Sequence, residues 1–277
     1  MMSRPVAILD SGIGGLPYLS WIQEHLPQEA LVYVADAAAF PYGEKTPDQV
    51  RATVVALGRA LVERYDAKLL LVACNTASVL ALDAVRSALT IPVVGVVPAV
   101  KTAATLGTGT LGVLATPRTV EDGYWETLVA QFAPGRRVKG FAAPDLVRLV
   151  EEGAPVADRE ILLSAWARKL QGEGVDSVVL GCTHYLHLAA DLQRLLGPSV
   201  SVVDSRDGVG RRVASVLEDR GLLAGSRTDA DKFHFSAQAG WGPEVLGPLE
   251  VRYRDWARKF QLAYAGPWVL EAAGAVR

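Results

Sequence analysis

Two short stretches hold the residues of this chain that are best suited to chemistry. LLLVACNTASVL covers residues 69–80, and SVVLGCTHYLHL covers residues 177–188. In each stretch an apolar run ends in a small residue, and a Cys follows with a short polar phrase that contains Thr. The stretches contain the only two cysteines of the sequence, Cys74 and Cys182. This repeat indicates that the two thiols occupy similar positions in two related halves of the chain.

A matched pair of thiols is suited to moving a proton across a carbon centre. A thiol is an acid with an unperturbed pKa of about 8.5, and its thiolate is a base. Two such groups on opposite faces of one carbon can remove a proton from one face and return a proton to the other, which inverts the centre. One thiol must begin as a thiolate, so each needs a neighbour that handles its proton. We expect Asp10 to serve Cys74 and His184 to serve Cys182.

The residues alone leave three other roles for the cysteines. A structural disulfide is one, although thiols stay reduced in the cytoplasm, where we expect the protein. Zinc binding is another, but Cys182-x-His184 lacks the usual ligand spacing and the sequence has no CxxC, so we predict no metal. The third is an inert buried cysteine, which is the ordinary role of a single Cys.

The elements that must position these residues alternate along the chain. Short β-branched runs predict strands, and most of them are uniformly apolar, as in parallel strands covered on both faces. They cover residues 6–9, 31–35, 68–73, 92–97, 111–115, 137–142, 177–181 and 199–204. The helix from Pro47 has the clearest start, because Thr46 and Gln49 match a capping box. Thr116 followed by Pro117 looks like a second such start.

This alternation predicts an α/β fold of two doubly wound, mostly parallel-sheet lobes related by pseudo-symmetry. We expect residues 1–96 with 207–277 to form the first lobe, which carries Cys74. Residues 97–206 are expected to form the second lobe, which carries Cys182. Each Cys follows a predicted strand, and ligands of open α/β sheets bind at that end of the strands. The active site is therefore expected in the cleft between the lobes.

Polar residues follow other predicted strands as well. Asp10 and Ser11 precede a glycine-rich turn, but Pro17 stands where a dinucleotide fingerprint needs its last glycine. Tyr42 and Gly43 lie in a turn-like loop after the second strand, where a turn and packing are their simplest roles.

The composition of the chain restricts its partners. The 277 residues are 50% hydrophobic and 21% charged, with a net charge of −2, so no charge excess points to nucleic acid or to an acidic membrane. The apolar run at the N-terminus is too short for a signal peptide, and polar residues interrupt the longest apolar region, residues 67–85. We predict a cytoplasmic protein that acts on a small molecule.

Five motifs together resemble the glutamate racemases of the aspartate/glutamate racemase superfamily. They are LDSGIGGL, PYGEKT, ACNTAS, VVGVVPA and GCTHY, in this order over roughly residues 5–210. The resemblance implies two α/β lobes and cofactor-independent racemisation of L-glutamate to D-glutamate by a two-thiol proton transfer at Cα. It implies that the D-glutamate supplies peptidoglycan synthesis, and hence cell-wall biogenesis and cell shape. A homodimer stays open.

The resemblance also implies roles for individual residues. Cys74 and Cys182 match the acid/base thiols, and in family members these take the α-proton of the D-isomer and of the L-isomer, respectively. An acidic helper falls on Glu151, with the adjacent Glu152 not excluded. The substrate-binding positions match Asp10, Ser11, Tyr42, Gly43, Asn75, Thr76, Thr183 and His184. Backbone N–H groups at the helix starts after Ser11, Thr76 and Thr183 are expected to bind the carboxylates.

Two features depart from the family pattern. Leu186 stands where the family usually has Pro, which removes a rigid helix start but no reacting group. Residues after about 230 match poorly, and we interpret residues 241–277 as a hydrophobic cover or a dimer contact. The alternative function is an aspartate racemase or another thiol-based isomerase of the superfamily, and a non-catalytic binding protein is a third.

Overall fold

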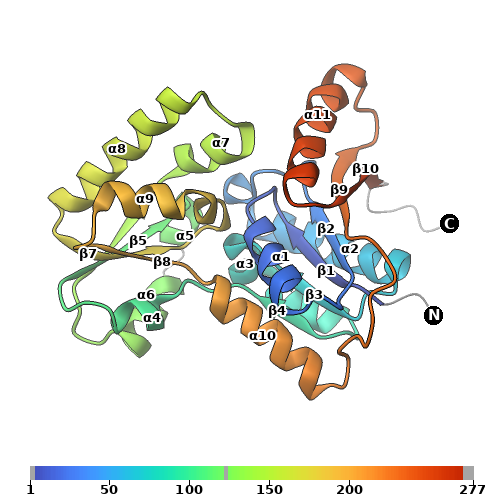
Figure 1. Cartoon of the computed structure of the whole chain (residues 1–277), viewed down its shortest axis with the longest axis horizontal. Helices are drawn as coiled ribbons and strands as arrows, with labels where there is room; N and C mark the ends of the chain where they lie inside the picture. The colour runs from blue at the N-terminus through green and yellow to red at the C-terminus, as the bar shows by residue number, and fades with distance from the viewer. Residues whose placement is uncertain (1–3, 122–123, 271–277) are drawn as a thin grey trace. The chain divides into compact units, whose positions relative to one another are not determined.

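Two parallel β-sheets organise the chain, one in each of two structural units (Figure 1). The computed structural model describes residues 4–121 and 124–270. The first unit contains the residues up to Gly95 and those from Val209 onward, and the second contains Val96–Gly208. Within the described ranges every strand pair is parallel. The predicted α/β class and all eight predicted strands are confirmed.

The sheet of the first unit has the strand order β10-β9-β2-β1-β3-β4. Its strands are β1 (Val6–Asp10), β2 (Leu31–Ala35), β3 (Leu69–Val72), β4 (Val93–Gly95), β9 (Lys232–Gln238) and β10 (Ala263–Leu270). Its helices are α1 (Leu16–His25), η1 (Tyr42–Glu44), α2 (Pro47–Tyr65), α3 (Asn75–Ala88), α10 (Arg206–Asp219) and α11 (Pro243–Lys259). Of these, η1 is a short 3₁₀ helix, and α10 begins in the last residues of the second unit.

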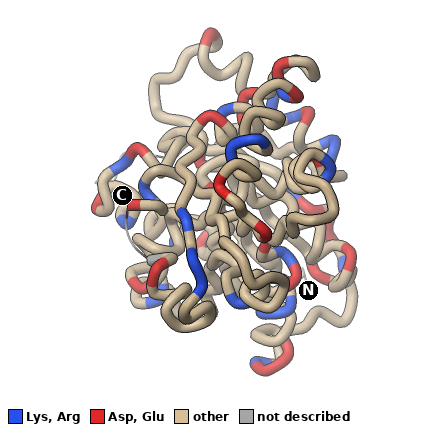
Figure 2. The backbone as a smooth tube through the Cα atoms, turned by 90° about the vertical axis from the view of Figure 1, so that its left-hand side faces the viewer, with Lys and Arg blue, Asp and Glu red and all other residues tan. Residues whose placement is uncertain are grey.

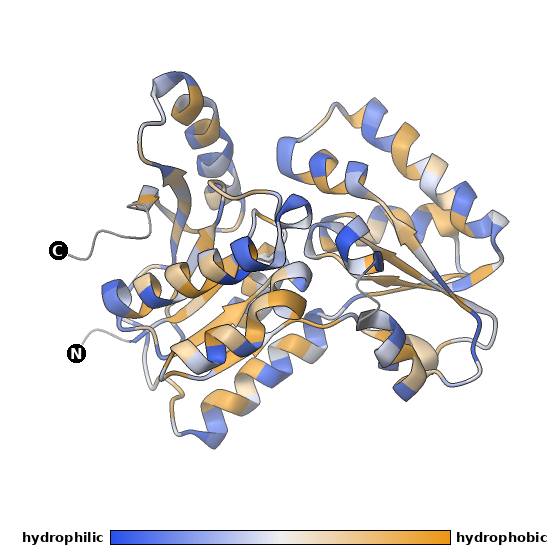
Figure 3. Ribbon diagram, turned by 180° about the vertical axis from the view of Figure 1, so that it is seen from behind, coloured by the Kyte–Doolittle hydropathy of each residue, from blue (hydrophilic) through white to orange (hydrophobic). Residues whose placement is uncertain are grey.

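Helices cover both faces of this first sheet. On one face α2 and α3 pack over the strands in a cluster that includes Leu57, Ala81 and Leu9. On the other face Tyr253 of α11 stacks on Phe235 of β9. Both faces of the central strands are thus buried, which explains why their sequences are apolar at nearly every position. Figure 3 shows these strands as largely hydrophobic, while the helices carry a hydrophilic side.

The predicted start of α2 is confirmed in detail. The Thr46 hydroxyl accepts a hydrogen bond from Gln49 N at 3.3 Å, and the Gln49 side chain accepts one from Thr46 N at 3.0 Å. Pro47 stands at the first helical position, where it lacks only an N–H group that has no helical partner. The helix ends before Asp66, which adopts a left-handed conformation with φ 49°.

The sheet of the second unit has the strand order β6-β5-β7-β8. Its strands are β5 (Thr110–Ala115), β6 (Val138–Ala142), β7 (Val175–Leu180) and β8 (Ser201–Val203). Its helices are α4 (Val100–Ala104), α5 (Pro117–Glu121), α6 (Tyr124–Phe132), α7 (Pro144–Glu152), α8 (Val156–Gly172), the 3₁₀ helix η2 (Thr183–Leu188) and α9 (Ala189–Leu196). The helix start expected at Thr116 is present, because its hydroxyl accepts from Thr119 N at 3.3 Å.

The two sheets repeat one topology. When strands are counted along the chain within each unit, β2-β1-β3-β4 and β6-β5-β7-β8 have the same order: second, first, third, fourth. Cys74 follows the third strand of the first unit, and Cys182 follows the third strand of the second. The repeated cysteine phrase therefore reflects a repeated fold, in which the carboxyl ends of the first and third strands are neighbours.

The C-terminal segment differs from the expectation. Helix α11 does act as a cover, since its Tyr253 and Ala257 are buried, but β9 and β10 extend the first sheet and were not predicted. β9 reads KFHFSAQ, with polar and apolar residues in strict alternation, which is a strand signal of a different kind from the uniformly apolar runs. Residues 271–277 lie outside the described part of the chain.

The charged residues show no separation by sign. Lys and Arg positions are interspersed with Asp and Glu positions along the backbone (Figure 2), in keeping with the net charge of −2. Among the described helices, none is both long enough and apolar enough to cross a bilayer.

A buried histidine joins the C-terminal strands to α2. His234 of β9 donates from Nδ1 to Gly266 O at 3.2 Å, because a carbonyl can only accept, and its Nε2 therefore accepts from the hydroxyl of Tyr65. Burial lowers the pKa of His234 to about 4, and the charges of Arg64 and Lys232 act in the same direction. The folded state therefore holds this ring in its neutral form.

We expect His234 to make the protein sensitive to mild acid. Its folded pKa lies below the unfolded value near 6.5, so its stabilising effect is complete above pH 6.5 and is lost as the pH falls toward 4. The loss should amount to about 1–2 kcal/mol of the free energy of unfolding, after solvent screening is allowed for. Urea unfolding of the protein and of His234→Gln at several pH values measures it. If the free energy of unfolding of both proteins changed equally with pH, this expectation would be contradicted.

Candidate active site

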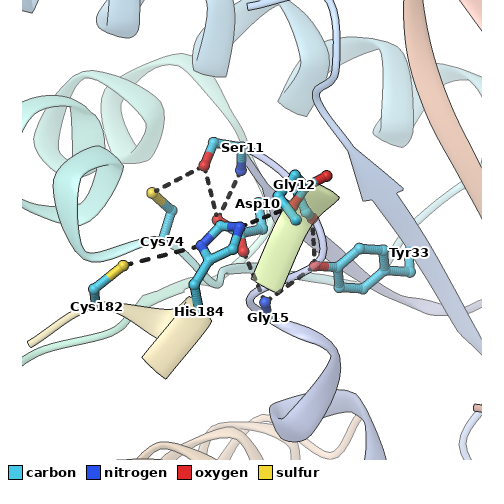
Figure 4. A network of polar contacts seen from close by, with 9 residues as sticks. Asp10, Ser11, Gly12, Gly15, Tyr33, Cys74, Cys182 and His184 are labelled. Carbon is cyan, nitrogen blue, oxygen red and sulfur yellow. Dashed lines mark hydrogen bonds and ion pairs between the residues drawn. The ribbon is translucent and has the colours of Figure 1, made fainter. Parts of the chain in front are cut away.

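The first thiol lies at the junction of β3 and α3. Cys74 is buried and occupies the N-cap position of α3. Its Sγ lies 3.9 Å from the Ser11 hydroxyl, which lies 3.5 Å from Asp10 Oδ1 (Figure 4). Strands β1 and β3 are paired with Leu9 opposite Val72, so the residues that follow both strands meet at one sheet edge. The structure thus brings Asp10 to Cys74 through Ser11, a link that the sequence did not indicate.

The carboxylate of Asp10 is held by the glycine-rich turn. It is fully buried, and it accepts from Ser11 N at 2.7 Å with one oxygen and from Gly15 N at 2.7 Å with the other. A Cβ atom on Gly15 would come within 2.7 Å of Ala73 Cβ, so only glycine fits there. The turn that resembles a dinucleotide fingerprint therefore binds the Asp10 carboxylate through its backbone N–H groups.

Tyr33 closes this turn from the neighbouring strand. Its hydroxyl donates to Gly12 O at 2.8 Å and accepts from Gly15 N at 3.1 Å (Figure 4). Neither Gly15 nor Tyr33 was singled out from the sequence. For Tyr33 the available signal is weak, because a tyrosine in an apolar strand normally indicates packing alone.

Tyr42 and Gly43 belong to η1, in the loop that follows β2. The Tyr42 hydroxyl donates to Asp36 Oδ2 at 2.6 Å, and both side chains are buried. Burial raises the pKa of Asp36, against the lowering effect of hydrogen bonds from Ser236 and Tyr42. Burial and the neighbouring Asp36 raise the pKa of Tyr42 well above its usual value. Tyr42 is therefore a fixed, neutral hydrogen-bonding group.

The first residues of α3 offer polar groups to a ligand. Asn75 and Thr76 begin the helix and are both buried. The side chain of Asn75 is only 3% exposed, and neither its oxygen nor its nitrogen has a hydrogen-bond partner among the described residues. An unsatisfied buried amide costs about 1–3 kcal/mol, so this group is stabilised if a polar ligand supplies the missing bonds.

The second thiol has a histidine and a carboxylate behind it. Cys182 follows β7, and its Sγ lies 3.9 Å from His184 Nδ1. The opposite ring nitrogen of His184 lies 2.8 Å from Glu151 Oε2. Glu151 is 1% exposed, whereas Glu152 points away and is exposed, so α7 presents Glu151 to the histidine. The second unit therefore brings Cys182, His184 and Glu151 into one line of contacts.

The neighbours of His184 favour the charged form of its ring. Burial acts to lower the pKa of His184, but the hydrogen bonds and charges of Cys182 and Glu151 prevail and raise it well above its usual value. A buried imidazolium next to a sulfur can exchange a proton with it, while the carboxylate orients the ring and balances its charge. The arrangement is suited to proton transfer at Cys182.

The turn that carries His184 is fixed to the sheet by a tyrosine. The buried Tyr185 hydroxyl donates to Ala143 O at 2.7 Å and shares its proton with Ala115 O at 3.2 Å, at the ends of β6 and β5. Thr183, at the start of η2, is also buried. Tyr185 belongs to the GCTHY phrase but was not assigned a role from the sequence.

Both cysteines are free thiols. His184 separates Cys182 from Glu151 by contacting each with a different ring nitrogen, so the three side chains do not converge on one point as metal ligands would. Within residues 4–121 and 124–270, no three His, Cys, Asp or Glu side chains gather in a way that could hold a metal ion.

These features define a class: a parallel α/β protein of two units, each with a buried thiol after the third strand and titratable side chains close to it. A family model described as Asp/Glu/Hydantoin racemase matches residues 18–207. The chain belongs to this family, as the motif resemblance predicted.

The relatives in this family are consistent with the motifs. The chain is 41% identical to the glutamate racemase of Roseiflexus sp. (strain RS-1) over 229 residues, which cover 82% of this chain and 84% of the relative. The crystal structure of Escherichia coli glutamate racemase in complex with L-glutamate and the activator UDP-MurNAc-Ala has a TM-score of 0.80 and 34% identity, covering 97% of this chain and all of that one. An aspartate racemase of Picrophilus torridus, at 14% identity with a TM-score of 0.55 over 79% of this chain and 95% of that one, shares the fold alone.

Proposed function

We propose that this protein is a glutamate racemase that inverts the α-carbon of glutamate by a two-thiol proton transfer. The observation that carries the proposal is the equivalent placement of two buried thiols, each after the third strand of its unit and each with its own acid/base neighbours. The names of the relatives at 34–41% identity support glutamate as the substrate, rather than the aspartate of the alternative.

In the proposed reaction one thiolate removes the α-proton while the other thiol delivers a proton to the opposite face. With L-glutamate, the Cys182 thiolate takes the proton and becomes a thiol, and Cys74 gives its proton and becomes a thiolate. D-glutamate reverses both transfers, so no external acid, base or oxidant is consumed. Asp10, with Ser11 beside it, serves Cys74, and His184, oriented by Glu151, serves Cys182.

The substrate carboxylates are bound mainly by neutral donors. The N-terminus of α3 presents backbone N–H groups, and the unsatisfied amide of Asn75 lies beside them. The remaining binding groups in the proposal are the hydroxyls and backbone groups of Ser11, Thr76, Thr183, Tyr42 and Gly43. Such fixed dipoles also stabilise the negative charge that develops as the α-proton leaves.

The proposal includes a cellular role. The D-glutamate formed would supply peptidoglycan synthesis, and hence cell-wall biogenesis and cell shape. The two free thiols agree with a cytoplasmic location. A homodimer through α11 is part of the proposal, because Val245 and Val251 are exposed on this helix; light scattering of the purified protein tests it.

Circular dichroism of the amino acid tests the function directly. After exhaustive dialysis against a chelator, the protein should bring the signal of L-glutamate to zero, since the two isomers are equal in free energy, and should leave L-aspartate largely unchanged. Loss of the aspartate signal instead would support the alternative racemase. No change with either amino acid, or activity restored only by a metal or pyridoxal phosphate, would refute the proposal.

A further inference from the structure

On the polar side of β9, His234 and Ser236 face the protein interior, while Gln238 at the end of the strand is exposed. Strict alternation normally indicates one solvent-exposed face, but β9 lies between β2 and β10 in the sheet. Ser236 is 0% exposed and His234 is also buried. Buried polar side chains are retained at a cost unless each finds partners, so the contacts of this face indicate what it does.

Ser236 binds the loop that follows β2. Its hydroxyl donates to Asp36 Oδ1 and accepts from Ala38 N at 2.9 Å. Two residues further along the same face, Gln238 Nε2 donates to Ala38 O at 2.8 Å. Both backbone polar groups of Ala38 are thus bound by side chains of β9, which lies 198–200 positions away in the sequence.

From this loop the contacts continue to the candidate site. Asp36 uses its second oxygen to accept from the Tyr42 hydroxyl at 2.6 Å, and its backbone N–H donates to Asp10 O at 2.8 Å. Ser236 and Tyr42 therefore bind the two oxygens of one buried carboxyl group. Without the Ser236 hydroxyl, Ala38 N and Asp36 Oδ1 would both lose a partner, and Asp36 is fully buried, so water does not easily replace the bond to its carboxyl group.

We propose that Ser236 is a positioning residue that fixes the loop bearing Tyr42 and Gly43, through Asp36 and Ala38, in the geometry that binds glutamate. Gln238 supports the same loop through its hydrogen bond to Ala38 O. The inference rests on the proposed function for the identity of the ligand. It assigns a part in substrate binding to β9, which lies outside the motifs that identify the family.

The kinetic consequence is a change in binding more than in chemistry. Ser236 has no contact with the groups that serve the thiols, so proton transfer should proceed at nearly the same rate once glutamate is bound. A loosened loop should weaken the contacts of Tyr42 and Gly43 with the substrate. In Ser236→Ala we therefore expect KM for glutamate to rise by about 5–30-fold, with kcat within about 3-fold of the unaltered protein.

Two further variants complete the kinetic test. Ser236→Thr keeps the hydroxyl and should recover most of the affinity. Ser215→Ala is the matched control, because it removes a serine hydroxyl that donates to Asp219 within helix α10, and its KM should not change. An unchanged KM in a folded Ser236→Ala, or a KM that rises equally in Ser215→Ala, would overturn the inference.

Hydrogen exchange provides a readout that does not depend on activity. In Ser236→Ala, mass spectrometry should show faster amide exchange in the peptide covering residues 36–45, which includes the Ala38 amide, and unchanged exchange in β1 and β3. Faster exchange throughout the first unit would indicate a general structural role and overturn the proposal. If the unaltered protein does not racemise glutamate, the proposed function fails, while local exchange still reports on the Ser236 contact.

If Ser236→Ala does not fold, Gln238→Ala tests the same positioning role. Gln238 is exposed and binds the same residue, Ala38, so its loss should leave the fold intact. A smaller rise in KM together with faster exchange in residues 36–45 would support the positioning role of β9. No change in either measurement would overturn it.

Discussion

Replacing either cysteine by serine should abolish racemisation in both directions. Inversion needs one group on each face of the α-carbon, and a serine hydroxyl is a far weaker acid than a thiol, so its alkoxide is scarce at neutral pH. We expect Cys74→Ser and Cys182→Ser each to lower the rate by on the order of 10³-fold or more, measured by circular dichroism with L- and D-glutamate. Both variants should fold normally, because the substitution is nearly isosteric and neither thiol forms a disulfide.

The partial reactions of these variants should differ by isomer. A protein that keeps only Cys182 should still exchange the α-proton of L-glutamate in D₂O faster than that of D-glutamate, and a protein that keeps only Cys74 should show the opposite preference. A substrate analogue that loses a leaving group after proton removal gives the clearest measurement, since elimination requires one base only. If a single serine variant racemises both isomers at nearly the normal rate, the two-thiol mechanism is wrong.

The parts of the fold that can be predicted from sequence are those encoded by patterns of neighbouring residues. Most of strands β1 to β8 are apolar runs, because both of their faces are buried, and the capping box at Thr46 lies within four residues. β9 does have a local strand signal, the strict alternation of KFHFSAQ, but this differs from the uniformly apolar runs that predicted the other strands. Its place in the sheet is not encoded locally, because β9 pairs with β2 through residues about 200 positions apart, and β10 then pairs with β9.

The same distinction holds for the candidate site. Asp10, Cys74, Cys182 and His184 are found in sequence because each follows a predicted strand. Ser236 and Tyr33 were not found, because their roles lie in contacts with loops from other strands.

The choice between Glu151 and Glu152, by contrast, could have been made from helical spacing. Glu151 lies four residues after Val147 and next to Val150, on the buried side of α7, whereas Glu152 lies four residues after the surface residue Arg148.

The proton-handling partners should affect the two faces of the reaction unequally. We expect His184→Asn to slow racemisation by ~10²–10⁴-fold and Asp10→Asn to do the same, if each takes part in proton transfer at its own cysteine. In the partial reactions, His184→Asn should mainly impair proton removal from L-glutamate, and Asp10→Asn should mainly impair removal from D-glutamate. Unchanged rates in folded variants would exclude these residues from the mechanism, and unfolded variants would assign them a structural role.

The charge of His184 adds a test by pH. Contacts with Cys182 and Glu151 raise its pKa above the unfolded value near 6.5, so the stability it contributes is complete below pH 6.5 and is lost as the pH rises through the folded pKa. Glu151→Gln keeps a hydrogen-bonding group but removes one of the two partners that raise this pKa. The imidazolium should then lose its proton at a lower pH. In a plot of the rate with L-glutamate against pH, the fall on the alkaline side should therefore begin at a lower pH. A profile identical to that of the unaltered protein would show that Glu151 does not control the protonation of His184 during turnover.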